Sequence, residues 1–435
     1  MIARSPNNRL AGVCPALVAL ALCLGLASPA HAAPRTRSPY PAGASRPSIL
    51  ARPSDFARPA SSKRAPGRAS ARRSPRRKSR KPVLHGDAAR ALVAFQAMQK
   101  HYYLQGSGLY SGEPFSYLWP FSQAFAVTVS MAHVPRVPVS FARELKARLV
   151  GLDSYLDRNN SGAPEGMYTS TLAAFDGTVA PPAGPGGTKY YDDNDWIGIE
   201  LVRAYELTHD PTVLASAEAV MAFEMAGWDT NQEHACPGGI PFSNAAENND
   251  RNTVTTAPAA ELGAQLYRIT ANAQYLQFAL KAYEWVRRCL LAPTGLYADH
   301  ISPKGVVEPM LWSYNQGTMI GAGALLYQAT GNSGYLYEAR QSARAALAYF
   351  TPERLGSEIP FFPSVYFRNL LYLDSITRDP PGKGLAQSYV DYAWQHLRLA
   401  DNLFVAGSPP SAQLLVQAAI AQIYALLASP ASTYF

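Results

Sequence analysis

The sequence has 435 residues, 48% of them hydrophobic and 16% charged, which is enough to bury a sizeable core, and its net charge is +8. This charge is unevenly distributed. Residues 1–82 hold 17 Lys/Arg and a single acid, net +16, whereas residues 83–435 hold 22 Lys/Arg against 30 Asp/Glu, net −8. An acidic main part without a basic stripe argues against nucleic acid as its partner.

The first residues have the features of a secretory signal peptide. An apolar run over 16–27 follows Arg4 and Arg9, and a small-x-small cleavage site stands at 30–32. The run is shorter than the roughly 20 residues that a membrane span needs. We therefore expect residues 1–33 to be a signal peptide, and we expect no transmembrane segment. The protein is expected to be secreted or located at the cell surface or in the periplasm.

Residues 34–82 are rich in Pro, Arg, Ser and Ala and contain almost no large apolar side chains. Such a composition cannot bury enough surface to offset the entropy lost on ordering, so we expect a disordered linker. Its basic run, 72–81, suggests contact with an anionic cell surface or wall polymer. A solvated spacer without a partner fits the same composition, and both interpretations stay open.

Two of the four cysteines, Cys14 and Cys23, fall within the signal peptide. The mature chain keeps Cys236 and Cys289. In an oxidising compartment these two can form one disulfide. Two separate buried thiols fit the sequence equally well.

Three segments share one pattern around a threonine, at Thr208, Thr270 and Thr330. In each copy a Tyr stands three residues before the threonine, a Leu six after it and an Ala nine after it, and the copies are 62 and 60 residues apart. Apolar residues recur at helical spacing on both sides of a turn signal such as Asp210-Pro211. Each copy therefore predicts a helical hairpin, which must cover its apolar face by packing on its neighbours.

At this spacing, residues 83–435 hold six hairpins and no convincing strand alternation, so the expected fold class is all-α. Six hairpins form either an open superhelix or a closed (α/α)6 barrel. The long loops 159–191, 227–252 and 291–316 favour a barrel with one elaborated rim, and long ordered loops commonly carry function. We therefore expect 83–435 to be one (α/α)6-barrel catalytic domain. Its twelve helices are expected near 87–104, 119–132, 138–158, 192–208, 211–226, 253–269, 273–290, 317–330, 333–350, 364–377, 385–402 and 409–428.

The candidate catalytic residues stand where the fourth helix begins, in the run Tyr190-Tyr191-Asp192-Asp193-Asn194-Asp195-Trp196. Helix capping is one explanation, because Asp and Asn accept hydrogen bonds from the N–H groups of a first turn. One cap, however, needs one or two such residues rather than four. Glycoside hydrolysis requires paired carboxylates, and adjacent residues of a helix point roughly 100° apart. Asp192 and Asp193 could therefore flank one sugar ring.

Aromatic and amide side chains stand at three further helix starts. The segments are Trp119-Pro120-Phe121-Ser122-Gln123, then Gly238 to Ser243 leading to Arg251-Asn252-Thr253, and Trp312-Ser313-Tyr314-Asn315-Gln316-Gly317. Aromatic faces suit sugar rings, and amides and guanidinium groups bond hydroxyls. Taken singly, each tryptophan fits a core residue and each amide fits a cap. Their shared position at helix starts favours a binding role.

Other chemistries lack their signatures. There is no His-Glu-x-x-His, no G-x-S-x-G and no Gly-rich phosphate loop after a strand. His234-Ala235-Cys236 is too isolated for a metal site, and the remaining histidines show no ligand spacing. We therefore expect no metal site.

Together these motifs resemble glycoside hydrolase family 76, the endo-α-1,6-mannanases. The resemblance is carried by Tyr191-Asp192-Asp193-Asn194 with Trp196, by Gly238-Gly239-Ile240 with Arg251-Asn252, and by Trp312 to Gly317, and it spans about 110–425. It implies an (α/α)6 barrel, a retaining mechanism and no cofactor.

By position, the resemblance implies that Asp192 is the nucleophile and Asp193 the general acid/base. The implied sugar-binding residues are Asn252, Trp312, Tyr314, Asn315 and Gln316, to which we add Tyr191, Asn194, Trp119 and Gln123 from the same helix starts. Three features depart from the family pattern: the long loop 159–191, the third acid Asp195, and the lack of a tryptophan over 238–242. They bear on substrate detail more than on reaction type.

We therefore expect a secreted glycoside hydrolase that cleaves α-1,6-mannan backbones, with an α-mannan polysaccharide or oligosaccharide as its partner. A glycan transglycosylase on the same barrel is the nearest alternative, and it differs in excluding water from the acceptor site. A non-catalytic glycan-binding protein is a second alternative, against which the intact Asp192 and Asp193 argue. A sugar epimerase would need catalytic histidines at helix starts, and none stands there.

Overall fold

Helices account for nearly all of the regular structure. The structure, a computed structural model, describes residues 84–158, 172–379, 381–407 and 411–435, which lie in one compact unit, Arg77–Phe435. The helices are α1 (Gly86–Tyr102), α2 (Leu118–His133), α3 (Phe141–Asp153), α4 (Tyr191–Thr208), α5 (Pro211–Ala226), α6 (Thr253–Thr270), α7 (Ala273–Leu290), α8 (Ser313–Thr330), α9 (Ser333–Tyr349), α10 (Pro352–Ser357), α11 (Phe361–Thr377), α12 (Pro381–Tyr392) and α13 (Leu414–Ala428).

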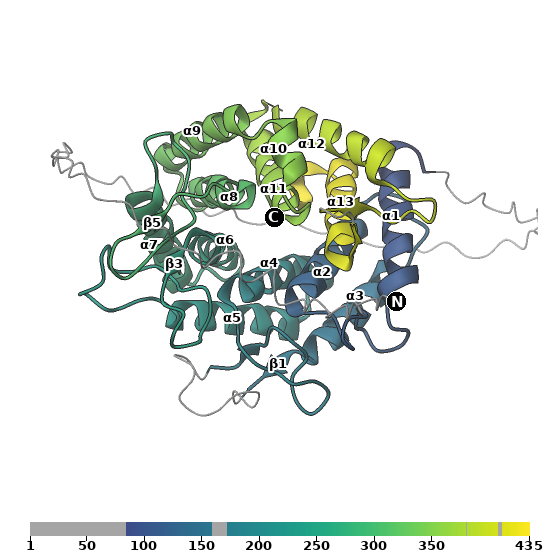
Figure 1. The fold of residues 1–435 in the computed structure, drawn as a ribbon, viewed down its shortest axis with the longest axis horizontal. Helices are drawn as coiled ribbons and strands as arrows, with labels where there is room; N and C mark the ends of the chain where they lie inside the picture. Colours follow the sequence, from purple (N-terminus) through teal and green to yellow (C-terminus); the bar gives the residue numbers. More distant parts are fainter. Residues whose placement is uncertain (1–83, 159–171, 380, 408–410) are drawn as a thin grey trace, which may run out of the picture. The chain divides into compact units, whose positions relative to one another are not determined.

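The helices form two concentric rings (Figure 1). Helices α2, α4, α6, α8, α11 and α13 surround the centre, and each packs on the next. Contact between α13 and α2 closes this inner ring. The outer helices α1, α3, α5, α7, α9 and α12 pack on inner partners, as α5 does on α4 and α7 on α6. The chain therefore folds as the closed (α/α)6 barrel that its sequence predicts, rather than as an open superhelix.

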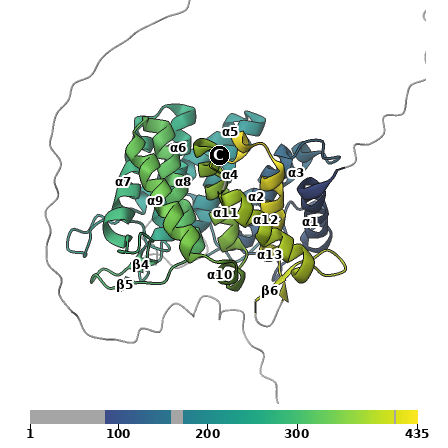
Figure 2. The same cartoon turned by 90° about the horizontal axis from the view of Figure 1, so that it is seen from above.

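Inner and outer helices differ in burial, as their positions require. Helix α13 is buried without interruption from Leu414 to Leu426, whereas α7 buries only one stripe, which includes Phe278, Ala282 and Trp285. A helix that is apolar on every side fits the centre of a ring, and an amphipathic helix fits the outside. Long connections run from outer to inner helices. Figure 2 shows β4, β5, β6 and α10, which belong to these connections, at one end of the helices, opposite the C-terminus.

The threonine pattern is explained by the turns at the other end. The Thr208 hydroxyl donates to the carbonyl of Ala204 at 2.9 Å and accepts from the backbone N–H of Asp210. Thr270 and Thr330 make the equivalent contacts. The residue after each threonine has a left-handed backbone conformation. Its N–H donates to the carbonyl of the tyrosine that stands three residues before the threonine. Each threonine thus joins the end of an inner helix to the cap of the next outer one.

The barrel interior contains an ion network. Arg203 and Arg368 each donate to the Glu200 carboxylate at 2.6 Å, and Arg368 also lies 3.8 Å from Glu261. All four side chains are buried, and they come from α4, α6 and α11. Arg203 in addition donates to the carbonyl of Thr433 at 3.1 Å. The network therefore links three inner helices to the C-terminal segment.

Several details differ from the sequence-based expectation. Helix α8 begins at Ser313 rather than near 317, α3 ends at Asp153, and α12 gives way to a π-helix at Ala393–Leu397. The short helix α10 was not expected. Seven strands occur in the described part of the chain: β1 (Leu156–Asp157), β2 (Ala174–Phe175), β3 (Arg251–Asn252), β4 (His300–Ile301), β5 (Val307–Glu308), β6 (Val405–Ala406) and β7 (Ser411–Ala412). Each has two residues, which is too short to show an alternating pattern.

The described residues answer some of the remaining expectations. Cys236 and Cys289 form a disulfide, which decides between the two alternatives that the sequence left open. No helix of the described residues is long and apolar enough to cross a membrane. The expected signal peptide, 1–33, and the expected linker, 34–82, lie outside the described residues, as does most of the first half of loop 159–191.

Candidate active site

The two candidate catalytic acids occupy the first turn of α4. Tyr190 is extended and pairs with Ser243, and the backbone N–H of Tyr191 donates to the carbonyl of Phe242, so the loop before α6 fixes the start of α4. Asp192 is half-buried and Asp193 is 7% exposed. The pair thus stands at the end of the ring where the long loops gather.

A buried lysine holds the segment that leads into α4. The Lys189 ammonium is fully buried and lies 3.2 Å from Asp157 and 3.0 Å from Asp176. Next to it, the Asn194 amide donates to the carbonyls of Phe175 and Tyr190 and accepts from the N–H of Phe175. These contacts tie β1 and β2 to the first turn of α4.

Four inner helices bring aromatic rings together around Phe361, the first residue of α11. Its ring centroid lies 5.2 Å from that of Trp119 on α2, 5.6 Å from Trp196 on α4 and 6.2 Å from Tyr314 on α8. The next residue, Phe362, packs on Tyr314 at 4.1 Å and on Trp312 at 5.3 Å. The structure therefore brings the predicted residues Trp119, Trp312 and Tyr314 to the same end of the barrel as the acid pair.

Another acid, Asp299, lies at this end of the barrel, where two neighbouring side chains hold its carboxylate in place. Its carboxylate accepts from the Asn315 amide at 3.0 Å and from His300 Nδ1 at 3.0 Å, and it is 4% exposed. The charge of Asp299 acts on both Asp192 and Tyr314. Asp299 thus belongs to the electrostatic surroundings of the acid pair.

The two acids differ in how well their anions are stabilised. Burial raises the pKa of Asp192 to about 7, backbone N–H groups of Asp192 and Asp193 lower it, and the charge of Asp299 raises it. Burial raises the pKa of Asp193 well above its usual range, and the neighbouring Asp192 charge raises it further. The backbone N–H groups at the helix N-terminus therefore favour the anion of Asp192 over that of Asp193.

Two more buried acids lie near the pair. Asp195 on α4 and Glu224 on α5 are fully buried, and their carboxylate oxygens have no hydrogen-bond partner among the described residues. Burial raises the pKa of both well above the usual range, and each feels the charge of Asp192. Burial therefore favours the protonated form of both acids over the anion, and neither forms a salt bridge within the described part of the chain.

The predicted amide residues divide into two groups. Both amide hydrogens of Asn194 bond backbone carbonyls, and Gln316 is held by Tyr297 and Trp312 in the same way. We assign these two to holding the loops in place. Asn315 keeps a buried carbonyl oxygen without a partner among the described residues. Within the described part of the chain, the Gln123 amide donates only to Ser122, and the Asn252 amide only to the carbonyl of Asp250.

Tyr191, also predicted to bind substrate, is fully buried. Its ring stacks on Phe223 with centroids 4.5 Å apart and an angle of 17°, and the backbone at Gly227 lies against the same ring. A Cβ at Gly227 would stand 2.4 Å from Tyr191 Cε1. Tyr191 therefore anchors α4 on α5 and sets the direction of the two acids that follow it.

Sequence reasoning missed three residues of this end: Phe361, Asp299 and Glu358. Glu358 accepts from the N–H and the hydroxyl of Ser313 and so caps α8, and burial raises its pKa to about 7. Of the three, only Phe361 has a recognisable sequence signal. It and Phe362 form an aromatic pair at a helix start, the same position at which Trp119 and Trp312 were predicted to bind substrate. Asp299 and Glu358 stand in loops without any motif. No group of three or more metal-ligating side chains occurs among the residues described.

This combination of a closed double ring of helices and an acid pair at its loop end defines a class of glycoside hydrolase. The sequence model of Glycosyl hydrolase family 76 matches residues 87–370, and the chain belongs to that family. Among curated relatives, the mannan endo-1,6-alpha-mannosidase DCW1 of Saccharomyces cerevisiae is 28% identical over 184 residues. That match covers 39% of this chain and 40% of the yeast protein, so the chain spans less than half of this relative's length.

Solved structures of the family share the fold. A glycoside hydrolase family 76 mannosidase from Bacteroides thetaiotaomicron superposes with a TM-score of 0.68 at 22% identity, covering 79% of this chain and 98% of the other. An inactive variant of the α-1,6-mannanase GH76A of a Salegentibacter species, in complex with α-1,6-mannotriose, has a TM-score of 0.64 at 22% identity. It covers 79% of this chain and 99% of that chain.

Proposed function

We propose that the chain is a secreted glycoside hydrolase that cleaves α-1,6-mannan backbones with retention of configuration, using Asp192 and Asp193. The observation that carries this proposal is the placement of two adjacent carboxyl groups in the first turn of α4, where backbone N–H groups favour the anion of Asp192. A retaining glycosidase needs one ionised and one protonated carboxyl group.

The roles follow from what stabilises each charge state. Asp192, whose anion accepts hydrogen bonds from the helix N-terminus, attacks the anomeric carbon as the glycosidic C–O bond breaks. Asp193, the more deeply buried acid, gives its proton to the departing oxygen. In the second step Asp193 takes a proton from water, the water oxygen attacks the anomeric carbon, and the bond to Asp192 breaks. One water is consumed for each glycosidic bond.

Polar atoms near the pair suit a sugar. Trp119 Nε1 and Asn315 Oδ1 are buried and have no hydrogen-bond partner among the described residues, which leaves one donor and one acceptor unsatisfied. Buried polar groups normally find partners, so hydroxyl groups of a ligand are suited to these two positions. Tyr314 and Trp312 add aromatic surface from the start of α8, in keeping with their predicted binding role.

The names of the relatives support the substrate. The yeast relative is called a mannan endo-1,6-alpha-mannosidase, and the Salegentibacter enzyme an α-1,6-mannanase. Its inactive variant has two adjacent aspartates replaced by asparagine. We extend both points to this chain, with Asp192 and Asp193 in the place of that pair.

Two experiments test the proposal. In the first, the chain is incubated with debranched α-1,6-mannan, lipomannan, xylan and β-mannan, and the products are sized. We expect internal cleavage of the α-1,6-linked polymers; cleavage restricted to β-linked polymers contradicts the proposal. Products longer than the starting oligosaccharide would indicate a transglycosylase instead of a hydrolase.

The second experiment separates the two acids with Asp192→Asn and Asp193→Asn. Asp192→Asn is expected to lose turnover of every substrate. Asp193→Asn should lose about 10²- to 10⁴-fold on mannan, yet keep its first step on glycosides with good leaving groups, and azide should accelerate its second step. Asp210→Asn, at the exposed start of α5, is the matched control. Near-normal mannan cleavage by either variant would show that the pair only caps α4.

A further inference from the structure

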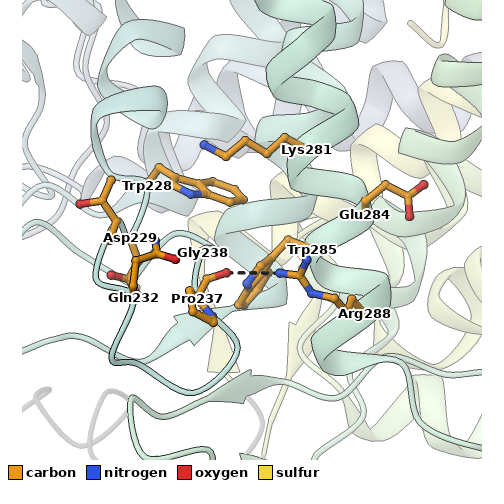
Figure 3. Close-up of a pocket in the computed structure, with 10 residues that line it drawn as sticks. Trp228, Asp229, Gln232, Pro237, Gly238, Lys281, Glu284, Trp285 and Arg288 are labelled. Carbon is orange, nitrogen blue, oxygen red and sulfur yellow. Dashed lines mark hydrogen bonds between the residues drawn. The ribbon is translucent and has the colours of Figure 1, made fainter. Parts of the chain in front are cut away.

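A separate cavity lies between the outer helix α7 and the loop that follows α5 (Figure 3). Its volume is about 680 Å³, which is within the range of ligand pockets, and its lining includes no residue of the candidate active site. We call it the Trp228 pocket. The residues that matter for its chemistry are Trp228, Asp229, Gln232, Lys281, Glu284 and Arg288.

The walls of the Trp228 pocket are joined covalently and by hydrogen bonds. The disulfide between Cys236 and Cys289 ties the loop to the end of α7. Trp285 Nε1 donates to the carbonyl of Cys236 at 3.0 Å, and Arg288 Nη2 donates to the carbonyl of Pro237 at 3.3 Å. The cavity is therefore formed before any ligand arrives, which lowers the ordering cost of binding.

Two glycines allow the loop to lie directly against both indoles. Gly238 and Gly239 have φ values of +108° and +83°. A Cβ at Gly238 would stand 2.6 Å from Trp228, and one at Gly239 would stand 2.5 Å from Trp285. The Gly-Gly pair that the sequence singles out thus shapes this pocket.

The lining combines an aromatic surface with charged side chains of both signs. Trp228 is half-buried and meets the edge of Trp285 at 6.4 Å and 76°. Lys281 Nζ lies 3.8 Å from the centre of the Trp228 ring. Figure 3 shows the Lys281 side chain beside that ring, and within the described residues burial is the only influence on its pKa, which it lowers. The lining contains two cationic side chains, Lys281 and Arg288, and two carboxylates, Glu284 and Asp229. Of these, Asp229 is already bonded to Arg251 and His234. A pocket rich in donors and acceptors beside an indole suits a polyol with an apolar face, which is a pyranose.

The pocket is coupled to the loop that reaches the candidate active site. Asp229 accepts from Arg251 Nη1 at 2.6 Å and from His234 at 2.8 Å. Arg251 is fully buried and directly precedes Asn252, the start of the segment leading into α6. The Trp228 pocket and the acid pair therefore share the loop between α5 and α6.

We propose that the Trp228 pocket is a second carbohydrate-binding site, which holds a mannose unit of an α-1,6-mannan chain outside the catalytic centre. Its carbohydrate class follows from the lining; the identity of the sugar rests on the proposed function. Such a site keeps the polymer on the protein between cleavage events and raises the local concentration of the backbone.

The test is a calorimetric titration of the full chain carrying Asp192→Asn with α-1,6-mannotetraose. We expect two molecules of tetrasaccharide per chain, and one after Trp228→Ala is added. Lys281→Met and Glu284→Gln change exposed side chains, so they guard against misfolding. Each should weaken binding at the second site by about tenfold, the loss expected for one hydrogen bond to the ligand. Trp394→Ala removes a tryptophan that is likewise covered by a cation, from Arg398 at 4.2 Å, and should change nothing.

A stoichiometry of one that is unaffected by the pocket substitutions overturns the inference, as does the absence of any binding. Turnover of mannotetraose by the unsubstituted chain is measured in parallel. Turnover with a single, pocket-independent binding site refutes only the second site. Absence of turnover together with a Trp228-dependent site refutes only the proposed function.

Discussion

The side-chain amide of Asn315 donates to Asp299 at 3.0 Å, and this contact holds the Asp299 carboxylate close enough to influence Asp192. Asn315 is on α8, Asp299 precedes β4, and Asp192 begins α4. The loop before β4 and the start of α8 thus influence the proton affinity of a carboxyl group at the start of α4. The consequence can be measured in the pH dependence of activity.

Asp299→Asn is expected to move the acidic limb of the kcat/KM profile to lower pH, by on the order of half a unit. The charge of Asp299 raises the pKa of Asp192, and removing it lets Asp192 ionise at lower pH. The profile is recorded on mannotetraose between pH 4 and pH 9. Asp250→Asn, which alters another acid beside His300, is the control; an equal shift in both variants would mean that Asp299 has no particular role.

Glu224→Gln is expected to make the protein more stable at high pH. The folded-state pKa of Glu224 lies well above its unfolded value, so the folded state holds a proton that the unfolded state releases. Stability is therefore greatest below the unfolded pKa, about 4.3, and falls as pH rises toward the folded value. Urea unfolding at pH 5 and pH 8 should show the advantage of the variant growing with pH. Glu247→Gln, on the surface, should show no such trend.

Lys189→Met should destabilise the barrel by about 3–5 kcal/mol, because it leaves Asp157 and Asp176 buried without their shared cation. Burial already raises the pKa of Asp176 to about 6, against the effect of Lys189. The loss should be smaller at pH 5, where Asp176 can take up a proton. Equal losses at pH 5 and pH 8 in urea unfolding would argue against this account, and the exposed Lys304→Met serves as the reference.

Replacing both Cys236 and Cys289 by serine should lower the free energy of unfolding by about 3–4 kcal/mol, as expected when a cross-link across 53 residues is lost from the unfolded chain. The measurement is guanidinium unfolding of both proteins under oxidising conditions. Adding a reductant should lower the stability of the parent chain and leave that of the double variant unchanged. If reductant affects neither protein, the two thiols are not linked in solution.

The basic run 72–81 predicts adhesion to anionic surfaces. Adhesion should weaken steeply with salt, since exposed charges are screened beyond about 10 Å at 0.1 M. Deletion of 34–82 should abolish adhesion to anionic vesicles in a sedimentation assay while oligosaccharide turnover continues. If the shortened chain binds equally well, the segment is a spacer.

The hairpins of the barrel could be predicted from the sequence, and the acid pair could be recognised there as a candidate. The threonine pattern fixed the turns after α4, α6 and α8 because its hydrogen bonds join residues two and four apart, so the information is local. Asp192 and Asp193 could be singled out for the same reason: their peculiarity is adjacency at a helix start. The disulfide between Cys236 and Cys289 could be named only as one of two alternatives.

The surroundings of the pair depend on tertiary contacts that no local pattern in the sequence reveals. Phe361 gathers Trp119, Trp196 and Tyr314 from three other helices because the ring closes, and no local pattern encodes which helices become neighbours. The protonation of the two aspartates likewise depends on tertiary packing. Two aspartates with identical intrinsic acidity come to differ because one is met by helix N–H groups and the other is buried deeper, and burial and field are properties of the packed barrel.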